Sequence, residues 1–315
     1  MTVIPSDDLT PANVPLQSGP PTREELLVYY PAKFTWQQLK TFVNSGDLGL
    51  LKRDRTLQKR YQAWANGIKA EYGSMVNYLL SYRLQWGKAD TLSKLHSRLD
   101  GLNAPVDREE PAGLVPGGTA GQPTNVVGQL PTIPPDAKPY FTADISESLI
   151  SIIQNDWPYS VPASIEHTLI WTVLPIFPPN LPPSIQPRLL QDGLWGFTGL
   201  SPDSPPPSPS TLPSCLPALA EWGVTEKSLT RSPPGTEEDN KLVREVGSEV
   251  QNFVCARWNE REWETAWFVN PPVSLLLYLI NPSLYDPRFQ RLQSVPGLAH
   301  IHVFARYKLE EEMVQ

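Results

Sequence analysis

Three of the four histidines in this 315-residue chain stand in patterns that could do chemistry. His300 and His302 flank Ile301 in an apolar stretch, and the two-residue period of a strand would place both imidazoles on one face. His167 opens a second apolar run, whereas His96 stands alone in a polar stretch and is expected at the surface. A neutral imidazole can act as a base or a nucleophile near pH 7. We therefore predict that His167, His300 and His302 contribute to a ligand site.

The same three histidines also admit a structural interpretation, in which each is a strand residue that hydrogen-bonds to a neighbouring polar group. A zinc ion would need four ligands, and His167 is the one evident addition to the His300–His302 pair. The carboxylate of Asp156 could complete such a set, but the sequence does not show that these residues meet. We therefore predict neither a metal site nor a cofactor, and both interpretations of the histidines stay open.

The segment Asn155-Asp156-Trp157-Pro158-Tyr159 is the second candidate for chemistry. It offers an amide, a carboxylate, an indole N–H and a phenol within one turn, and such loops can line a ligand pocket. It could equally be a rigid corner, with its aromatic rings packed inward and its first two residues capping the turn. In the first case the ligand-binding residues are Asn155, Asp156, Trp157, Tyr159, His167, His300 and His302.

Helical and strand patterns surround these candidates. Thr35 can cap a helix with Trp36 and Leu39 on one face, and Asp54 can cap a longer helix that Gly73 interrupts. Further helices are expected over 75–82, 146–154 and 238–256, and strands over 167–173, 262–269 and 299–307. These patterns predict an α+β fold in which a helical N-terminal part packs on a mainly antiparallel sheet, with long proline-rich loops.

Proline divides the chain into regions, because 36 residues are proline, well above the usual share of about 5%. The expected organisation is a disordered tail over 1–22, a helical N-terminal part over 23–100, a flexible Pro/Gly linker over 101–139 and an α+β core over 140–310 with a low-complexity insertion over 201–235. The core is thus expected to contain both candidate segments.

Charge and hydropathy exclude several classes of protein. The net charge of −7 lacks the basic footprint of a nucleic-acid binder. The first eight residues lack the basic and apolar regions of a signal peptide. The longest apolar run, Val273–Ile280, is far shorter than the ~20 residues of a membrane-spanning helix. We expect a cytoplasmic protein with neither nucleic acid nor membrane as a partner.

Four blocks of sequence together form the pattern of a known family. They are Phe34–Leu39 with Tyr61, Trp64 and Ile68–Ser74, then Ile152–Tyr159 followed by Ile165–Thr172, then Leu194–Gly199, and last Trp267–Pro271 with Leu292–Val303. In this order they resemble the fungal N-acetylglucosamine-induced proteins, whose domain is of unknown function. The resemblance implies a setting in the response to amino sugar and no established reaction. The family pattern almost joins the two parts of the last block, so residues 273–291 are an added segment, either a genuine insertion or an unspliced intron.

A second similarity links His300-Ile301-His302-Val303-Phe304 to the histidine-triad proteins, which are nucleotide hydrolases and transferases. By this similarity His302 would be the catalytic nucleophile toward a phosphorus atom, with His300 and Asn155 as positioning groups. Phe304 stands where that motif has its third histidine, and Gly297 alone represents its glycine-rich approach.

Three hypotheses about function follow. The first is a protein of the amino-sugar response that binds a small polar or phosphorylated ligand, related to amino sugars or nucleotides, with little or no catalysis. The second is a histidine-triad-like hydrolase or transferase of nucleotides or nucleotide sugars, so whether the chain is an enzyme stays open. The third is an interaction scaffold whose Ser/Pro-rich segment 201–214 binds an SH3 or WW domain.

Overall fold

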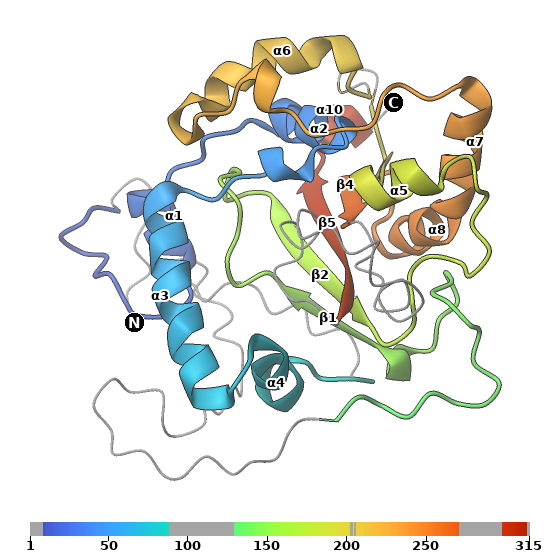
Figure 1. Ribbon diagram of the computed structural model, residues 1–315. Coiled ribbons are helices and arrows are strands. Elements are labelled where there is room, and N and C mark those ends of the chain that lie inside the picture. Colours follow the sequence, from blue (N-terminus) through green and yellow to red (C-terminus); the bar gives the residue numbers. More distant parts are fainter. Residues whose placement is uncertain (1–8, 88–128, 202–203, 205, 271–297, 314–315) are drawn as a thin grey trace.

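The computed structural model describes residues 9–87, 129–201, 204, 206–270 and 298–313. These residues build a five-stranded sheet in which all neighbouring strands are antiparallel (Figure 1). The strands are β1 (Ile150–Gln154), β2 (Glu166–Thr172), β3 (Leu194–Thr198), β4 (Trp263–Val269) and β5 (Ala299–Tyr307). Their order is β1-β2-β5-β4-β3, so the last strand in the chain lies at the centre of the sheet. The predicted α+β class with an antiparallel sheet is confirmed.

Helices precede the sheet and separate its strands. Before β1 come α1 (Arg23–Tyr29), α2 (Trp36–Asn44), η2 (Leu48–Leu50), α3 (Arg55–Tyr72), α4 (Met75–Tyr78), η3 (Leu79–Arg83) and η4 (Glu147–Leu149). One helix, α5 (Gln186–Asp192), lies between β2 and β3. Between β3 and β4 come η5 (Pro209–Thr211), α6 (Leu212–Cys215), η6 (Leu216–Trp222), η7 (Glu226–Ser228), α7 (Glu237–Val246) and α8 (Ser248–Arg257). The helix α10 (Glu310–Met313) follows β5. Among the described helices, none combines the length and the apolar character needed to cross a bilayer.

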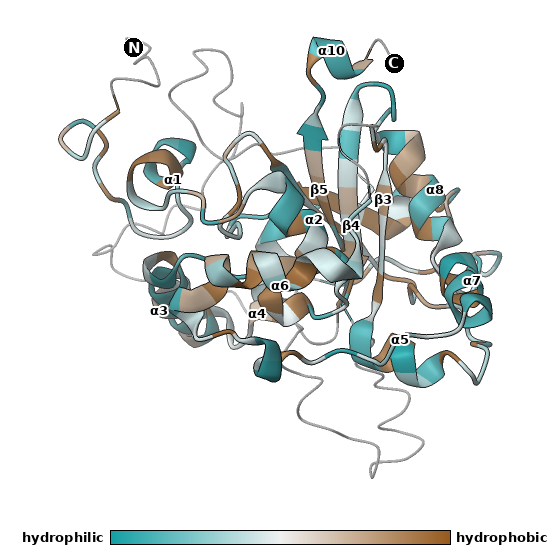
Figure 2. Cartoon of the chain, turned by 90° about the horizontal axis from the view of Figure 1, so that it is seen from above, coloured by the Kyte–Doolittle hydropathy of each residue, from teal (hydrophilic) through white to brown (hydrophobic). Residues whose placement is uncertain are grey.

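The helices cover both faces of the sheet and so produce three layers (Figure 2). One outer layer consists of α5, α7 and α8, and the other of α2, α3, α4 and α6. Alternation along β5 assigns its side chains to these layers, because successive residues of a strand point to opposite faces. Ile301, Val303 and Ala305 face the first layer, whereas His300 and His302 face the second.

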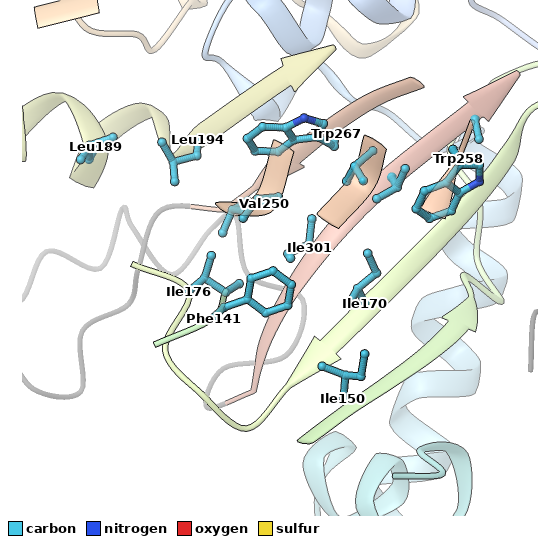
Figure 3. Close-up of a cluster of buried hydrophobic side chains, with 14 of the residues drawn as sticks. Phe141, Ile150, Ile170, Ile176, Leu189, Leu194, Val250, Trp258, Trp267 and Ile301 are labelled. Atoms are coloured by element: carbon cyan, nitrogen blue, oxygen red, sulfur yellow. The ribbon is translucent and has the colours of Figure 1, made fainter. Parts of the chain in front are cut away.

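The larger apolar core lies between the sheet and the layer of α5, α7 and α8. Figure 3 shows Ile170 and Ile301 on neighbouring strands beside Val250 of α8. Trp267 closes this core, and its indole N–H donates a hydrogen bond to Gln251 Oε1 at 2.6 Å. Apolar side chains thus dominate this face of the sheet, where the buried hydroxyl groups of Thr198 and Thr265 hydrogen-bond to each other at 2.7 Å. The histidines of the described strands lie on the opposite face.

Capping residues explain where the N-terminal helices begin and end. At the start of α2 the Thr35 hydroxyl accepts from the Gln38 N–H while the Gln38 side chain accepts from the Thr35 N–H. Asp54 caps α3 by accepting from two backbone N–H groups. Gly73 ends α3 at a φ of 76°, a conformation that glycine adopts without strain. Both predicted helix starts are confirmed.

The helix predicted over 146–154 is wrong beyond its first turn. A short turn occupies Glu147–Leu149, and the chain then enters β1. Ile152 pairs with Ile170 of β2 across the sheet, and β-branched side chains fit this pleated, partly buried surface well. Pairing with β2 therefore outweighs the local amphipathic pattern.

The helix predicted over 238–256 is two helices, α7 and α8, which meet at Gly247. A Cβ atom at Gly247 would lie 3.2 Å from the indole of Trp267, closer than an ordinary van der Waals contact. The close approach of this junction to the sheet therefore explains the glycine.

Several of the predicted boundaries fall on residues that the structure does not describe. Residues 1–8 of the predicted tail, 101–128 of the predicted linker and all of 273–291 lie outside the described residues. Residues 9–22 are described, and the Tyr29 hydroxyl of α1 donates to the carbonyl of Val14 at 2.6 Å. This part of the predicted tail therefore lies against α1.

The predicted insertion over 201–235 contains helical turns in its described part. Leu212, Leu216 and Leu219 from α6 and η6 are buried in a cluster with α2 and with Phe268 and Phe304 of the sheet. The segment thus forms part of the second helical layer.

Gly199 follows β3 in a turn that only glycine fits. Its φ is +62°, and a Cβ atom there would lie 1.9 Å from the carbonyl oxygen of Trp263. We expect Gly199→Ala to lower the free energy of unfolding by about 2–3 kcal/mol, because the backbone must shift to admit the methyl group. Urea unfolding measures this loss. The control is Gly67→Ala in α3, where nothing lies within 4 Å of the new methyl group. It should stabilise by up to about 1 kcal/mol, and equal effects at both sites would contradict the argument.

Candidate functional site

Strand pairing brings three histidines together on one face of the sheet. His302 of β5 lies opposite Leu169 of β2, and His300 lies opposite Trp171. His167 precedes Leu169 by two residues and so shares its face. The ring centroids of His167 and His302 are 5.3 Å apart, and those of His302 and His300 are 5.0 Å apart. We call His167, His302 and His300 the histidine row.

Hydrogen bonds connect the histidine row to its surroundings. His167 Nε2 and His302 Nδ1 are 3.0 Å apart, and Asn155 Nδ2 lies 3.2 Å from His167 Nδ1. At the other end, His300 Nδ1 donates to the Leu298 carbonyl oxygen at 3.0 Å. The Nε2 atoms of His300 and His302 are buried and make no hydrogen bond to the described residues. The structure therefore places Asn155 beside the histidines.

Aromatic rings enclose the histidine row. Phe268 stacks on His302 with centroids 4.3 Å apart and an interplanar angle of 9°, and Trp171 stacks on His300 at the same distance. Tyr159 covers His167 with ring centroids 5.2 Å apart. The three histidines consequently expose between 1% and 4% of their surface.

Burial keeps these imidazoles neutral. Desolvation is the main cause that lowers the pKa of His167 and of His302 well below the ordinary value of 6.5, and the nearby positive charge of Arg53 lowers both further. Desolvation lowers the pKa of His300 to about 4, although its hydrogen bond to a backbone carbonyl acts in the opposite direction. At pH 7 each ring is therefore uncharged, with one donor and one acceptor nitrogen.

The loop after β1 holds two of its predicted site residues away from the histidine row. The Asp156 carboxylate accepts two hydrogen bonds from Arg83, at 2.8 and 2.9 Å. Trp157 is buried against Tyr61, and its carbonyl oxygen accepts two hydrogen bonds from Arg53. These contacts support the corner interpretation for Asp156 and Trp157, whereas Asn155 and Tyr159 contact the histidine row.

A pocket of about 440 Å³ lies beside the histidine row, between α1, the start of α3 and the segment 158–167. His167 and Tyr159 belong to its wall. Its charged lining residues are Arg23, Asp54 and Glu166, and Gln154, Ser160 and Ser164 add further polar groups. We call this cavity the α1–β2 pocket.

None of the three charged pocket residues, Arg23, Asp54 and Glu166, was predicted from the sequence as a ligand-binding residue. Arg23 opens α1 and carries no motif, and Asp54 shows in the sequence only as a helix cap. The structure brings both beside His167, more than a hundred residues along the chain. Such long-range contacts depend on the packing of α1 against α3 and of α3 against the sheet, which no local pattern specifies.

The histidine row is arranged for hydrogen bonding rather than for metal binding. Within the described parts of the chain, no group of three or more His, Cys, Asp or Glu side chains could hold a metal ion. Asp156, the carboxylate considered as an additional ligand, pairs with Arg83 instead.

His302 lies in the interior, although the histidine-triad similarity would make it a nucleophile. Phe268 covers its ring face, and its free Nε2 atom is buried. Phe304, at the position of the third histidine of that motif, packs on His167 with centroids 4.2 Å apart. A phosphorus atom could reach His302 only if these enclosing side chains moved.

Comparisons with known proteins give a sequence relative that matches less than half of this chain and a solved structure aligned over most of it. N-acetylglucosamine-induced protein 1 of Candida albicans is 22% identical over 143 residues, which cover 45% of this chain and 44% of that protein. The match therefore spans less than half of the relative's length. A crystal structure of HTC1 covers 89% of this chain and 88% of its own, at 18% identity and a TM-score of 0.30, which is too low to relate the two folds.

The family model described as "Protein of unknown function (DUF3605)" matches residues 35–181. This segment includes α2, α3, β1 and β2, and with them Asn155, Tyr159 and His167. His300 and His302 lie beyond it. Residues 35–181 are therefore similar to this family of unknown function, in agreement with the resemblance of the chain to the N-acetylglucosamine-induced proteins.

Proposed function

We propose that this protein binds a small polar ligand of the amino-sugar class in the α1–β2 pocket. The proposal rests on the pocket lining, which contains two carboxylate residues, Asp54 and Glu166, and one guanidinium residue, Arg23, together with His167, whose imidazole is neutral. Asp54 and Glu166 can accept hydrogen bonds from hydroxyl and ammonium groups, and Arg23 can donate to hydroxyl or carbonyl oxygens. A few convergent polar groups in a largely apolar cavity are typical of small-molecule sites.

The charge of the pocket favours a cationic or neutral ligand over a phosphorylated one. Asp54 and Glu166 each contribute −1, Arg23 contributes +1, and His167 is neutral, so the lining carries a net charge of −1. A phosphate group would meet more negative than positive charge, whereas the ammonium group of glucosamine would find two carboxylates. N-acetylglucosamine, which is neutral, should bind with intermediate strength.

We choose amino sugars as the ligands to test because the similar Candida albicans protein is named after one of them. Its name, N-acetylglucosamine-induced protein 1, associates it with this sugar. We extend that association to the present chain as part of the proposal, and with it a role in the response to amino sugar.

Binding without phosphoryl transfer fits the histidine row better than hydrolysis does. A histidine nucleophile must reach the phosphorus atom with a free nitrogen, and the free Nε2 of His302 is enclosed by aromatic rings. His167, a lining residue of the pocket, already uses both ring nitrogens in hydrogen bonds. The histidine row therefore offers no accessible nucleophilic nitrogen, and its role in this proposal is structural.

Isothermal titration calorimetry of the full chain tests this proposal with glucosamine, N-acetylglucosamine and glucosamine 6-phosphate. Glucosamine should bind most tightly and the phosphate most weakly. Glu166→Gln should weaken glucosamine binding about tenfold, which corresponds to about 1.4 kcal/mol for a lost charge-assisted hydrogen bond. Glu238→Gln on the exposed side of α7 makes the same chemical change far from the pocket and should leave binding unchanged.

Three results would count against the proposal. They are the absence of binding by all three sugars at millimolar concentration, tightest binding of the phosphate, and an equal loss of affinity in Glu166→Gln and Glu238→Gln. Turnover of a nucleotide sugar that disappears in His302→Gln would favour the hydrolase hypothesis instead.

A further inference from the structure

The hydrogen bonds at one end of the histidine row have a defined polarity. Asn155 Oδ1 accepts from the Trp157 backbone N–H at 3.0 Å, so the amide NH₂ of Asn155 faces His167 and donates to its Nδ1. In a neutral imidazole the other nitrogen then carries the proton, and His167 Nε2 donates to His302 Nδ1. By the same rule, His302 carries its proton on Nε2 as a donor.

His300 has the opposite polarity. Its Nδ1 lies 3.0 Å from the Leu298 carbonyl oxygen, which can only accept, so Nδ1 carries the proton. The Nε2 atom of His300 is therefore an acceptor. It faces no described donor, just as the Nε2–H of His302 faces no described acceptor. The two neighbouring rings thus present one buried donor and one buried acceptor, and neither has a hydrogen-bond partner among the described residues.

We infer that His302 and His300 form a buried binding position for one hydroxyl group, which accepts from His302 Nε2–H and donates to His300 Nε2. A hydroxyl group has both functions, and the rings are neighbours with centroids 5.0 Å apart. The indole N–H of Trp171, stacked on His300, is another buried donor without a described partner. Leaving such groups unsatisfied would cost the fold free energy, so occupancy stabilises the site.

The hydroxyl group belongs either to a buried water molecule or to an alcohol ligand. Buried waters typically make about three hydrogen bonds, and the three neighbouring rings leave two donors and one acceptor without a described partner. A sugar hydroxyl offers the same donor and acceptor. The inference concerns the buried Nε2 atoms of His300 and His302, and it holds whether or not the α1–β2 pocket binds sugar.

Nitrogen-15 NMR of the histidine rings in the full chain tests the polarity at pH 7.5. Two-bond couplings identify the protonated nitrogen of each ring, and only four histidines contribute signals. We expect protons on Nε2 of His167 and His302 and on Nδ1 of His300. A proton on Nδ1 of His302, a proton on Nε2 of His300, or a cationic ring would overturn the inference.

The occupant is identified by cross-relaxation from the His302 Hε2 proton. A cross-peak to water, unchanged by saturating glucosamine, would identify a water molecule, and its replacement by a sugar cross-peak would identify a ligand hydroxyl. Contacts to apolar protons alone under both conditions would overturn the inference.

His300→Phe supplies the matched variant, because it keeps an aromatic ring against Trp171 and removes the acceptor. The hydroxyl cross-peak should be lost in this variant, while the protonation of His167 and His302 should stay as in the wild type and so verify the fold. Persistence of the cross-peak would show that His300 does not hold the group.

Discussion

Lowering the pH from 7 to 5 should decrease the free energy of unfolding of this protein by roughly 5 kcal/mol, because three buried histidines must stay neutral in the folded state. In the unfolded chain each imidazole regains its ordinary pKa near 6.5 and binds a proton in this range. In the folded state the pKa of His300 is about 4, and those of His167 and His302 are also well below 6.5. The unfolded state therefore binds more protons, and stability falls as the pH drops through 6.5.

Urea unfolding at pH 7, 6 and 5 measures this dependence. Most carboxyl groups have an ordinary pKa near 4 and titrate mainly below the window, so histidines dominate it. His300→Phe removes one of the three imidazoles that bind a proton on unfolding, and it should therefore reduce the pH dependence of the free energy of unfolding by about a third. Equal stability at pH 7 and pH 5 would contradict a buried, neutral histidine row.

Glu264→Gln should destabilise the protein by about 3–5 kcal/mol, because it breaks a buried charge pair and leaves one partner uncompensated. Glu264 of β4 and Lys40 of α2 are both fully buried, with Lys40 Nζ 2.7 Å from Glu264 Oε1. Ser204 donates to the same carboxylate at 2.8 Å, and Arg306 of β5 donates to its second oxygen. The network joins α2 to the sheet.

The order of effects among related variants identifies the cause. Desolvation already lowers the pKa of Lys40, opposed by Glu264, so loss of the carboxylate leaves the ammonium group in the interior without its counter-ion. Lys40→Met should cost less than Glu264→Gln, because Glu264 keeps its pairing with Arg306. The double variant should cost less than the sum of both single variants in urea unfolding. A loss below about 0.5 kcal/mol for Glu264→Gln would show that the pair does not support the fold.

The sequence predicted the elements that carry the histidines because their patterns are local. The alternation around His300 and His302 and the β-branched run after His167 each specify a strand without reference to the rest of the chain. The same applies to α2 and α3, whose caps at Thr35 and Asp54 lie next to the helices they start.

The arrangement of those elements depends on contacts that the sequence does not express. His167 meets His302 across 135 residues, and Lys40 meets Glu264 across 224. The strand β1 was predicted as a helix because its residues satisfy both patterns, and pairing with β2 selected the strand. Asp156 pairs with Arg83, 73 residues away in the chain, and therefore does not contact the histidine row as predicted. This ion pair forms only when the chain folds.

The loop Asn155–Tyr159 also shows that local sequence does not specify long-range contacts. The sequence left a ligand loop and a rigid corner as equal alternatives, and the structure assigns different residues to each. Trp157 packs into an aromatic cluster with Tyr61, and its carbonyl engages Arg53. Asn155 instead contacts the histidine row, because its amide lies within hydrogen-bonding distance of His167.

A crystal structure of the full chain soaked with glucosamine tests the central claim most directly. We expect the sugar in the α1–β2 pocket, with its amino nitrogen about 3 Å from a carboxylate oxygen of Asp54 or Glu166 and with the histidine row in place behind it. Sugar bound at another surface, or an α1–β2 pocket without sugar at a concentration that saturates binding in solution, would contradict the account.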